Sequence, residues 1–188
     1  LALCADVSER SQMAAVFARV RAQLPPLRGI VHCAGVIDDH LLAELSLEHF
    51  VHVFAPKVRG ALVLHALCGA QPLDFFIVYS SVASALGSPG QANYSAANAF
   101  LDAFAHARTR LGQPTLSIQW GPFAAVGLAA ASAGRRPLLT EHGLEPEESY
   151  PLLSRLLAHP RPEVMVLRGS VKRLLAHYPA ESVATYLS

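Results

Sequence analysis

Four polar residues, Lys57, Ser81, Tyr94 and Asn98, have types and spacings that could support acid–base chemistry on a carbonyl group. Ser81 ends an apolar run, and Tyr94 stands thirteen residues later, near the start of an alanine-rich segment. Two hydroxyl groups at such positions could contact one carbonyl oxygen. A free tyrosine has a pKa of about 10, so it needs a nearby cation to exchange protons near neutral pH. Lys57 could supply that cation.

Asn98 follows Tyr94 by four residues, so one helical turn places both on one helix face. Asparagine is a mediocre helix former, which somewhat favours a functional reason for its position. Each residue alone has an ordinary explanation. The lysine could be a solvated charge on a helix, and the serine could form a hydrogen bond at the end of a strand. The tyrosine could be exposed to solvent, and the asparagine could bond to backbone carbonyl groups of its own helix. Only the four together indicate chemistry.

Short apolar runs alternate with amphipathic segments along the chain. Strands are expected at 1–7, 27–35, 74–81, 115–120 and 164–169. Helices are expected at 8–24, at 46–68, around Tyr94, at 145–159, and as two short pieces in 170–188; Ser8 and Ser46 would be N-caps, and Pro151 would lie in or near the first turn of its helix. The alternation predicts an α/β fold, a doubly wound parallel sheet with helices on both faces, forming one domain or part of one.

Ligands bind at the carboxyl ends of the strands in such sheets. The residues at those ends are Asp6, the segment 32–35, the pair Ser80 and Ser81, and the segment 121–123. Among these positions, Ser81 is the most informative, because its side chain and that of Tyr94 can lie in a single crevice.

Composition excludes several classes of function. The 188 residues are 52% hydrophobic and carry fifteen basic and fourteen acidic groups, so nothing favours nucleic acid or an acidic membrane surface as a partner. No apolar run approaches roughly 18 residues, and no signal peptide is recognisable. Three cysteines stand far apart, which favours reduced thiols and a cytoplasmic location. His49 and His52 could share a metal, but no third ligand has a matching spacing, so no metal is expected.

The chain resembles the short-chain dehydrogenase/reductase superfamily, with a Rossmann-like fold, and more closely the ketoreductase domains of modular polyketide synthases and the related domain of animal fatty acid synthase. The resemblance lies in IVHCAGVIDD, PKVRGALVLH, FFIVYSSVASALGSPGQANYSAANAFLDAF and LSIQWGPFAAVG, and it continues from about Asp6 to the end of the chain. Most superfamily members carry a lysine four residues after the tyrosine. Here lysine and asparagine are exchanged, with Lys57 upstream and Asn98 downstream, as in the synthase ketoreductases.

The resemblance implies a role for each matching residue. Tyr94 would donate a proton to the ketone, Ser81 would hydrogen-bond the same oxygen, and Lys57 would lower the tyrosine pKa and touch the nicotinamide ribose. Asn98 would help to hold the lysine and a proton-relay water. The other cofactor-binding residues would be Asp6 facing the adenine, Val7, Ala34 and Gly35 lining the ribose, and Gly121, Pro122 and Phe123 flanking the nicotinamide.

The implied reaction is hydride transfer from NADPH to a β-ketoacyl chain held as a thioester on an acyl carrier protein. VIDD resembles the LDD signature of the B-type stereochemical class, with Asp39 as its last acidic residue, and Leu86 stands where the opposite class typically carries tryptophan. A solvated or helix-capping role for the pair Asp38 and Asp39 stays equally open. Asp6 could likewise serve only as a helix-start residue.

Two expected parts are missing from the sequence: the phosphate-binding GxGxxG and a basic residue for the extra phosphate of NADPH. The resemblance begins at the third strand of the family's sheet, so the strand at 1–7 would lie roughly 14 Å from the next strand, without a pairing partner. We therefore expect the C-terminal part of a longer reductase domain. Its partners would be the missing N-terminal half and the neighbouring synthase domains of the same polypeptide.

Three functional hypotheses remain from the sequence. The first is an active ketoreductase, which the four residues in register favour. The second is a non-catalytic structural remnant, a packing module or a truncated fragment that is inactive alone. The third is a free-standing short-chain reductase of small alcohols, which the exchange of lysine and asparagine disfavours.

Overall fold

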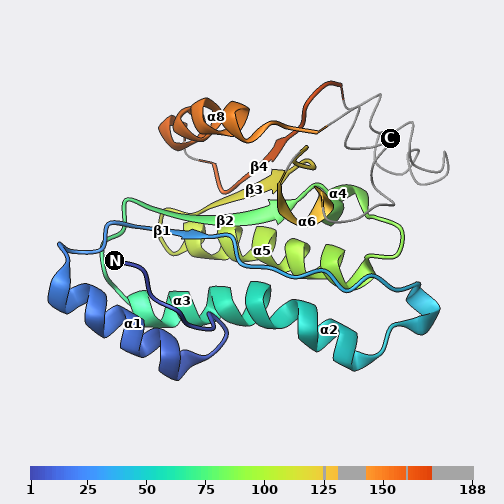
Figure 1. The fold of residues 1–188 in the computed structure, drawn as a ribbon. Coiled ribbons are helices and arrows are strands. Elements are labelled where there is room, and N and C mark those ends of the chain that lie inside the picture. Colours follow the sequence, from blue (N-terminus) through green and yellow to red (C-terminus); the bar gives the residue numbers. More distant parts are fainter. Residues whose placement is uncertain (125, 131–142, 160, 171–188) are drawn as a thin grey trace.

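The computed structural model describes residues 1–124, 126–130, 143–159 and 161–170, and a four-stranded parallel sheet lies at its centre (Figure 1). The strands are β1 (Gly29–His32), β2 (Phe75–Ser81), β3 (Leu116–Trp120) and β4 (Glu163–Val166), side by side in that order. Pairing places Ser81 opposite Trp120, so β2 and β3 end together. The expected α/β fold with a parallel sheet is confirmed.

Helices cover both faces of the sheet (Figure 1). α8 (Pro146–Ala158) lies on one face, and α3 (Gly60–Cys68) and α5 (Ala92–Arg110) lie on the other, with α1 (Arg10–Gln23) outside α3. α2 (Leu47–Phe54) leads into α3 through a π turn, Ala55–Arg59. The remaining described helical pieces are a 3-10 turn at Leu42–Glu44, α4 (Ala83–Leu86) and α6 (Gly127–Ala130).

Alternation along β2 and β3 separates two hydrophobic cores. Phe76 and Val78 face α3 and α5, whereas Ile77 faces α8, because successive side chains of a strand point to opposite faces. Phe17 of α1 and Leu101 of α5 belong to the first core. These two cores fix the sheet between its helix layers, so the carboxyl ends of the strands are held in place.

The strand expected at 1–7 is wrong: residues 1–6 have no regular structure and pair with no described strand. This agrees with the physical argument that the segment lacks a neighbour. Ser8 is not the N-cap of the following helix either. Glu9 holds that position, and the amide and hydroxyl groups of Ser8 both donate to the Asp6 carboxylate at 2.8 Å.

β1 is shorter than the expected strand at 27–35, and it is not buried on both faces. Ile30 and His32 are buried, but Val31 is 47% exposed. β1 forms the edge of the described sheet, and Val31 points to the face opposite that of Ile30 and His32.

The helix expected at 46–68 is correct in extent, with Ser46 as its N-cap, but it is interrupted by the π turn. By length and composition this 22-residue segment, with hydropathy 1.2, is long and apolar enough to cross a membrane. A core helix passes the same test, and this one packs against α1 and α5. These contacts bury Val53 and Ala61, whereas Leu47 and Val51 are exposed.

Two loops contain short helices that the sequence did not indicate. α4 lies within the turn region expected at 82–90, and α6 within the loop expected at 121–136. Pro151 is the sixth residue of α8, beyond the first turn, because Pro146 occupies the helix start. The short helices expected in 170–188 lie outside the described residues, apart from Ser170, which is not helical.

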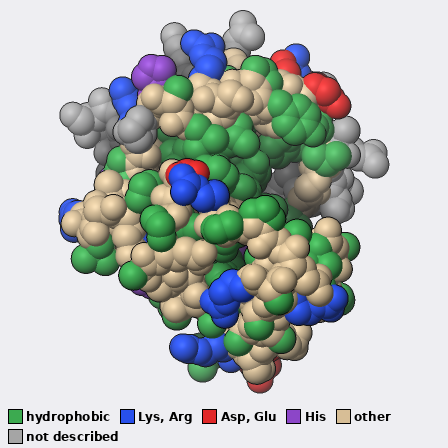
Figure 2. Space-filling view, turned by 90° about the vertical axis from the view of Figure 1, so that its left-hand side faces the viewer, with side chains coloured by type: hydrophobic (Ala, Val, Ile, Leu, Met, Phe, Trp, Pro, Cys, Tyr) green, Lys and Arg blue, Asp and Glu red, His purple; other side chains and the backbone are tan. Residues whose placement is uncertain are grey.

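Figure 2 faces the end of the molecule where β1 to β3 begin, and hydrophobic side chains gather there on a hollowed surface. A small cavity of about 120 Å³ lies at these strand starts, between the sheet and the end of α8. Phe75, Leu116 and Leu156 are among its lining residues. The candidate chemical residues lie at the opposite end.

Candidate active site

A crevice of about 370 Å³ opens where β1, β2 and β3 end. Lys57, Ser81 and Tyr94 line it together, although they come from the π turn, from β2 and from α5. The position is the one that a parallel sheet offers to ligands. The structure therefore brings three of the four candidate residues to one site.

Tyr94 lies in the first turn of α5, and the preceding residue, Asn93, holds the start of this helix in place. The fully buried Asn93 side chain donates to the backbone oxygen of Asp38 at 2.8 Å and to that of His49 at 3.3 Å. Its Oδ1 accepts the Tyr94 amide hydrogen at 2.8 Å. The loop after β1 and α2 thus hold the start of α5, and with it the backbone of Tyr94.

Lys57 is buried, with 4% of its surface exposed, and its ammonium donates to the backbone oxygen of Tyr79 at 3.0 Å. The same Nζ lies 5.3 Å from the centre of the Tyr94 ring. Burial lowers the pKa of Lys57 to about 8, and the charges of Asp102 and Cys33 oppose that shift. A cation beside the Tyr94 ring is the arrangement that phenolate stabilisation requires.

Ser81 is the last residue of β2, and its hydroxyl oxygen accepts the Ala83 amide hydrogen at 3.2 Å. A hydroxyl group can accept and donate at once, so this contact leaves the Ser81 hydrogen to donate to a ligand. Ser84 of α4 donates to the Ser81 backbone oxygen at 2.8 Å. The short helix α4 therefore holds the backbone of Ser81 in place.

Asn98 lies beneath the crevice, fully buried, and is not among its lining residues. Its Nδ2 donates to the backbone oxygen of Tyr94 at 2.8 Å, and its Oδ1 has no hydrogen-bond partner among the described residues. A buried acceptor of this kind suits a bound water. Lys57 is held by the Tyr79 oxygen rather than by Asn98.

The segment after β3 forms the opposite wall, with Gly121, Pro122 and Phe123 in the lining. The Gly121 amide donates to the Val166 oxygen at 2.8 Å, and a Cβ on Gly121 would lie 3.2 Å from that oxygen. Phe123 packs on Trp120, with ring centres 5.4 Å apart. β4 therefore sets the position of this wall.

Gly35 also lines the crevice, whereas Asp6, Val7, Ala34, Asp39 and Leu86 lie apart from its lining. The Asp6 carboxylate accepts hydrogen bonds from Ser8, which lower its pKa. Val7 packs against the first core and Ala34 is partly buried. Asp39 and Leu86 flank the site: the Asp39 carboxylate accepts from Gln91 at 2.8 Å, and Leu86 ends α4.

Sequence reasoning missed three residues that shape the site: Tyr79, Gln91 and Asn93. Tyr79 lines the crevice and precedes Ser81 by two, so the strand period of two could have placed both on one face. Burial raises the pKa of Tyr79. Gln91 lines the crevice, but its contact with Asp39 spans 52 positions and leaves no local signal.

The structure also groups Asp38, His40 and His49, whose ligand atoms lie within 4.8 Å of one another. The possible metal-binding neighbours of His49 are therefore Asp38 and His40 in the loop after β1, and not His52, as the helical spacing suggested. The imidazole rings of His40 and His49 are stacked, with centres 3.9 Å apart and an angle of 9° between their planes. A metal lies near the plane of each ligating ring, about 2 Å from its nitrogen, so these stacked rings cannot share one metal as they stand.

The fold and the site together define a class of protein: a Rossmann-like reductase of the short-chain dehydrogenase/reductase type. The family described as KR domain matches residues 1–125 of this chain. The chain belongs to this family, as part of a ketoreductase domain of a type I polyketide synthase.

Relatives and solved structures agree with this assignment. The chain is 39% identical over 164 residues to a phthioceranic/hydroxyphthioceranic acid synthase of Mycobacterium bovis (84% of this chain, 8% of that protein). It is 40% identical over 180 residues to the polyketide synthase GfsB of Streptomyces halstedii (95% and 3%). An A-type ketoreductase from a modular polyketide synthase matches with a TM-score of 0.85 and 32% identity, over 95% of this chain and 38% of that chain. A ketoreductase domain from the bacillaene assembly line matches with a TM-score of 0.82 and 29% identity (93% and 44%).

The crevice fits one end of a nicotinamide cofactor. Gly35 faces Lys57 so closely that a Cβ would lie 2.9 Å from the lysine Cε, and the Trp120 indole nitrogen in the lining is buried without a described partner. Gly35, Lys57 and Tyr94, with the wall at 121–123, would hold the nicotinamide ribose end. The GxGxxG loop that binds the diphosphate is not in this sequence.

Proposed function

We propose that this chain carries the catalytic residues of an NADPH-dependent β-ketoreductase that acts on acyl thioesters in polyketide synthesis. One observation carries the proposal: Ser81, Tyr94 and Lys57 meet in a single crevice where three parallel strands end. The bound cofactor would supply the hydride. The product would be the β-hydroxyacyl thioester.

The residues would act in sequence on the ketone oxygen. The Ser81 hydroxyl donates a hydrogen bond that orients the carbonyl group, and the Tyr94 phenol transfers its proton to the same oxygen as the alcohol forms. The ammonium of Lys57 stabilises the phenolate left behind. A water held by the Asn98 Oδ1 would relay a proton from bulk solvent to the tyrosine phenolate, which gives that buried acceptor its partner.

B-type stereochemistry is the outcome that the flanking residues favour. The Asp39 carboxylate accepts a hydrogen bond from Gln91, which precedes α5 and lines the crevice, so Asp39 lies next to a lining residue. Leu86 is aliphatic at the end of α4. Determining the configuration of the β-hydroxyacyl product, with the Asp39→Ala variant as comparison, tests this part. A product of A-type configuration would contradict it.

The substrate would be presented by an acyl carrier protein, and the rest of the reductase domain and neighbouring synthase domains would be the partners. The chain spans less than a tenth of the curated relatives described above and about two fifths of the solved ketoreductase chains. These partners are accordingly inferred from the family.

The central experiment follows NADPH oxidation by the full-length protein that carries this chain, with a β-ketoacyl thioester as substrate. Tyr94→Phe removes the proton donor and keeps the ring, so we expect kcat to fall by about 100-fold or more. Tyr150→Phe is the matched control, because Tyr150 is 67% exposed on α8. Full activity of Tyr94→Phe would refute the assignment. A wild-type protein without turnover would favour the structural remnant.

A further inference from the structure

We propose that His32 is a positioning residue for the ketoreduction: it holds the π turn that carries Lys57 and so keeps the lysine beside Tyr94. The inference depends on the proposed function, because it concerns the same lysine. His32 lies at the end of β1, outside the lining of the crevice. It would act through the backbone of Lys57 and not on the substrate.

The contact between His32 and Lys57 is direct and buried. The imidazole Nε2 lies 3.2 Å from the backbone oxygen of Lys57, and only 3% of His32 is exposed. A carbonyl oxygen only accepts hydrogen bonds, so Nε2 must carry a hydrogen and donate. Burial is the largest effect on the pKa of His32 and lowers it, although the hydrogen bond to the Lys57 oxygen opposes this shift, so the ring is neutral with its hydrogen on Nε2.

The π turn lies where the sequence interrupts the regular helix. Pro56 has no amide hydrogen, and its ring crowds the carbonyl group four residues earlier, so the regular helix cannot continue there. The Gly60 amide is shared between the oxygens of Ala55 and Lys57. The imidazole adds a side-chain donor to the Lys57 oxygen at this interruption of the helix.

The chain leaves room for the imidazole at Gly60. A Cβ there would lie 3.2 Å from the His32 Cε1 and 2.8 Å from a methyl group of Val7. Glycine at this position thus allows the end of β1 to approach the helix closely. Pro56, Gly60 and His32 thus surround the backbone of Lys57, and we call this arrangement the bracket.

This bracket matters because Lys57 is held at both ends. His32 fixes its backbone, and the Tyr79 oxygen fixes its ammonium 5.3 Å from the centre of the Tyr94 ring. The titratable groups around the lysine are His32 and Cys33 at the end of β1, Tyr79 on β2, and Tyr94 and Asp102 on α5. A shift of the π turn would move the ammonium away from the phenol, and displacements of about 1 Å can cost about 100-fold in rate.

The test compares His32→Leu with His32→Gln in the full-length protein that carries this chain. Leucine removes the donor, whereas the glutamine amide can replace it. We expect His32→Leu to lower kcat at least about tenfold, and Tyr94 to ionise at higher pH because its cation has moved. His32→Gln should recover most of both properties. His52→Leu, on the exposed side of α2, is the matched control.

The readouts are kcat against pH and the phenolate absorbance of Tyr94, taken as the difference from Tyr94→Phe. The second readout needs no turnover, so it tests His32 even if the proposed function fails. A folded His32→Leu protein with unchanged kcat and unchanged Tyr94 ionisation would overturn the inference. So would equal losses in both His32 variants that follow only the midpoint of thermal unfolding.

Gly60→Ala keeps the inference testable if His32→Leu does not fold. The added methyl group would lie 2.8 Å from Val7 and 3.2 Å from the His32 ring, so it should displace the π turn or the imidazole and reproduce the shift in Tyr94 ionisation. A folded Gly60→Ala protein whose Tyr94 ionises as in the wild type would contradict the bracket. Turnover by the wild-type protein, measured in the same series, decides the proposed function separately.

Discussion

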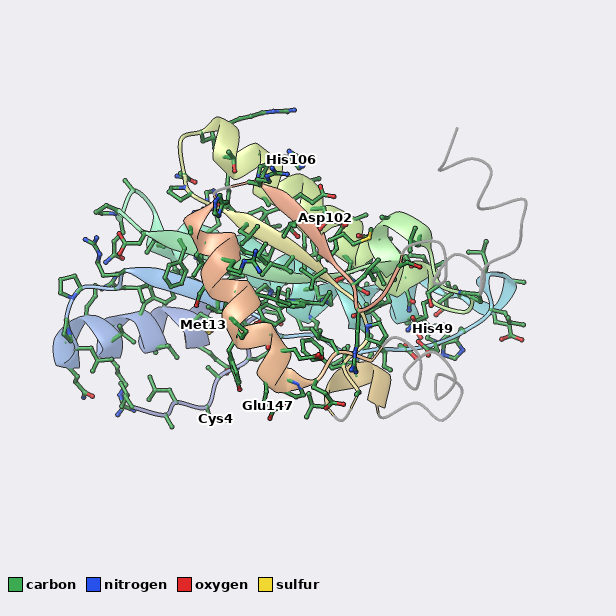
Figure 3. The ribbon with its side chains drawn as sticks, turned by 90° about the horizontal axis from the view of Figure 1, so that it is seen from above. Cys4, Met13, His49, Asp102, His106 and Glu147 are labelled. Atoms are coloured by element: carbon green, nitrogen blue, oxygen red, sulfur yellow. The ribbon has the colours of Figure 1, made fainter. Side chains whose placement is uncertain are left out.

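At the scale of single residues, Lys57 shows how burial and charge compete at this site. Removal from water disfavours the ammonium form and lowers its pKa to about 8, and Asp102 is the first of the charges that oppose this. The Asp102 carboxylate is itself held by Ser117 at 2.6 Å and by Gln119 at 2.8 Å. Figure 3 shows Asp102 and His106 along α5, next to β3 and β4. Asp102, which lies in the core next to the crevice, thus helps to set the pKa of Lys57.

The charge state of Lys57 predicts the alkaline side of the pH profile. Because its pKa is lowered to about 8, the lysine is cationic below that pH and loses its charge as the pH rises through it. The phenolate of Tyr94 would then lose its stabilising cation. We expect kcat/KM to fall above about pH 8, as measured with NADPH and a β-ketoacyl thioester across pH.

Asp102→Asn extends this prediction with a defined sign. Removal of the carboxylate takes away a charge that raises the lysine pKa, so the alkaline fall should move to lower pH. Glu163→Gln is the matched control, since Glu163 also accepts from Gln119, at 2.8 Å, but does not contribute to the lysine shift. A fall that stays in place in Asp102→Asn would argue against electrostatic tuning.

At the scale of elements, the interruptions in the helices have local causes and different consequences. The π turn in the segment 47–68 coincides with Pro56 and presents Lys57 to the crevice. The proline in α8, Pro151, lies away from the crevice lining, although α8 forms the core on the other face of the sheet. The first proline lies in the turn that presents Lys57, whereas the second lies within a continuous helix and removes one backbone hydrogen bond there.

Pro151→Ala should therefore stabilise the protein. Alanine restores the amide that can donate to the Glu147 oxygen and removes the ring from the helix interior, so the free energy of unfolding should rise by about 1 to 3 kcal/mol. Denaturant unfolding of the full-length protein measures it. Arg155→Ala, also exposed on α8, should change stability by no more than about 0.5 kcal/mol. A stability loss in Pro151→Ala would show that the proline has a role in packing.

At the scale of the whole molecule, the described sheet holds the crevice of the candidate catalytic residues but no diphosphate-binding loop. β1 is an edge strand with Val31 exposed, and the segment 1–6 pairs with no described strand. The matched ketoreductase structures are more than twice as long as this chain. The residues that would bind the diphosphate are missing from the sequence.

The isolated 188-residue polypeptide should accordingly bind NADPH poorly and show little or no turnover. The full-length protein that carries it should be active with the same thioester substrate. Fluorescence titration with NADPH and a turnover assay on both proteins measure the difference. Full turnover by the isolated polypeptide would contradict this prediction.

The sequence alone was sufficient for the class of fold and for the three candidate residues, Lys57, Ser81 and Tyr94, that line one crevice. Strand and helix periods are local patterns, and the spacings of Ser81, Tyr94 and Asn98 are set within one strand and one helix. Those features survive because neighbours in sequence determine them. The strand expected at 1–7 failed for the opposite reason, since a strand needs a partner and local pattern cannot supply one.

Only the tertiary structure decided which distant residues meet. The contacts of His32 with the Lys57 oxygen, of Gln91 with Asp39, and of the lysine ammonium with the Tyr79 oxygen join segments 22 to 52 positions apart. Such contacts depend on how the sheet and helices pack, and no local period encodes them. The sequence by itself determined which groups can do the chemistry, whereas the packing of β1, β2 and α5 around the π turn decided where the lysine sits and what charge it carries.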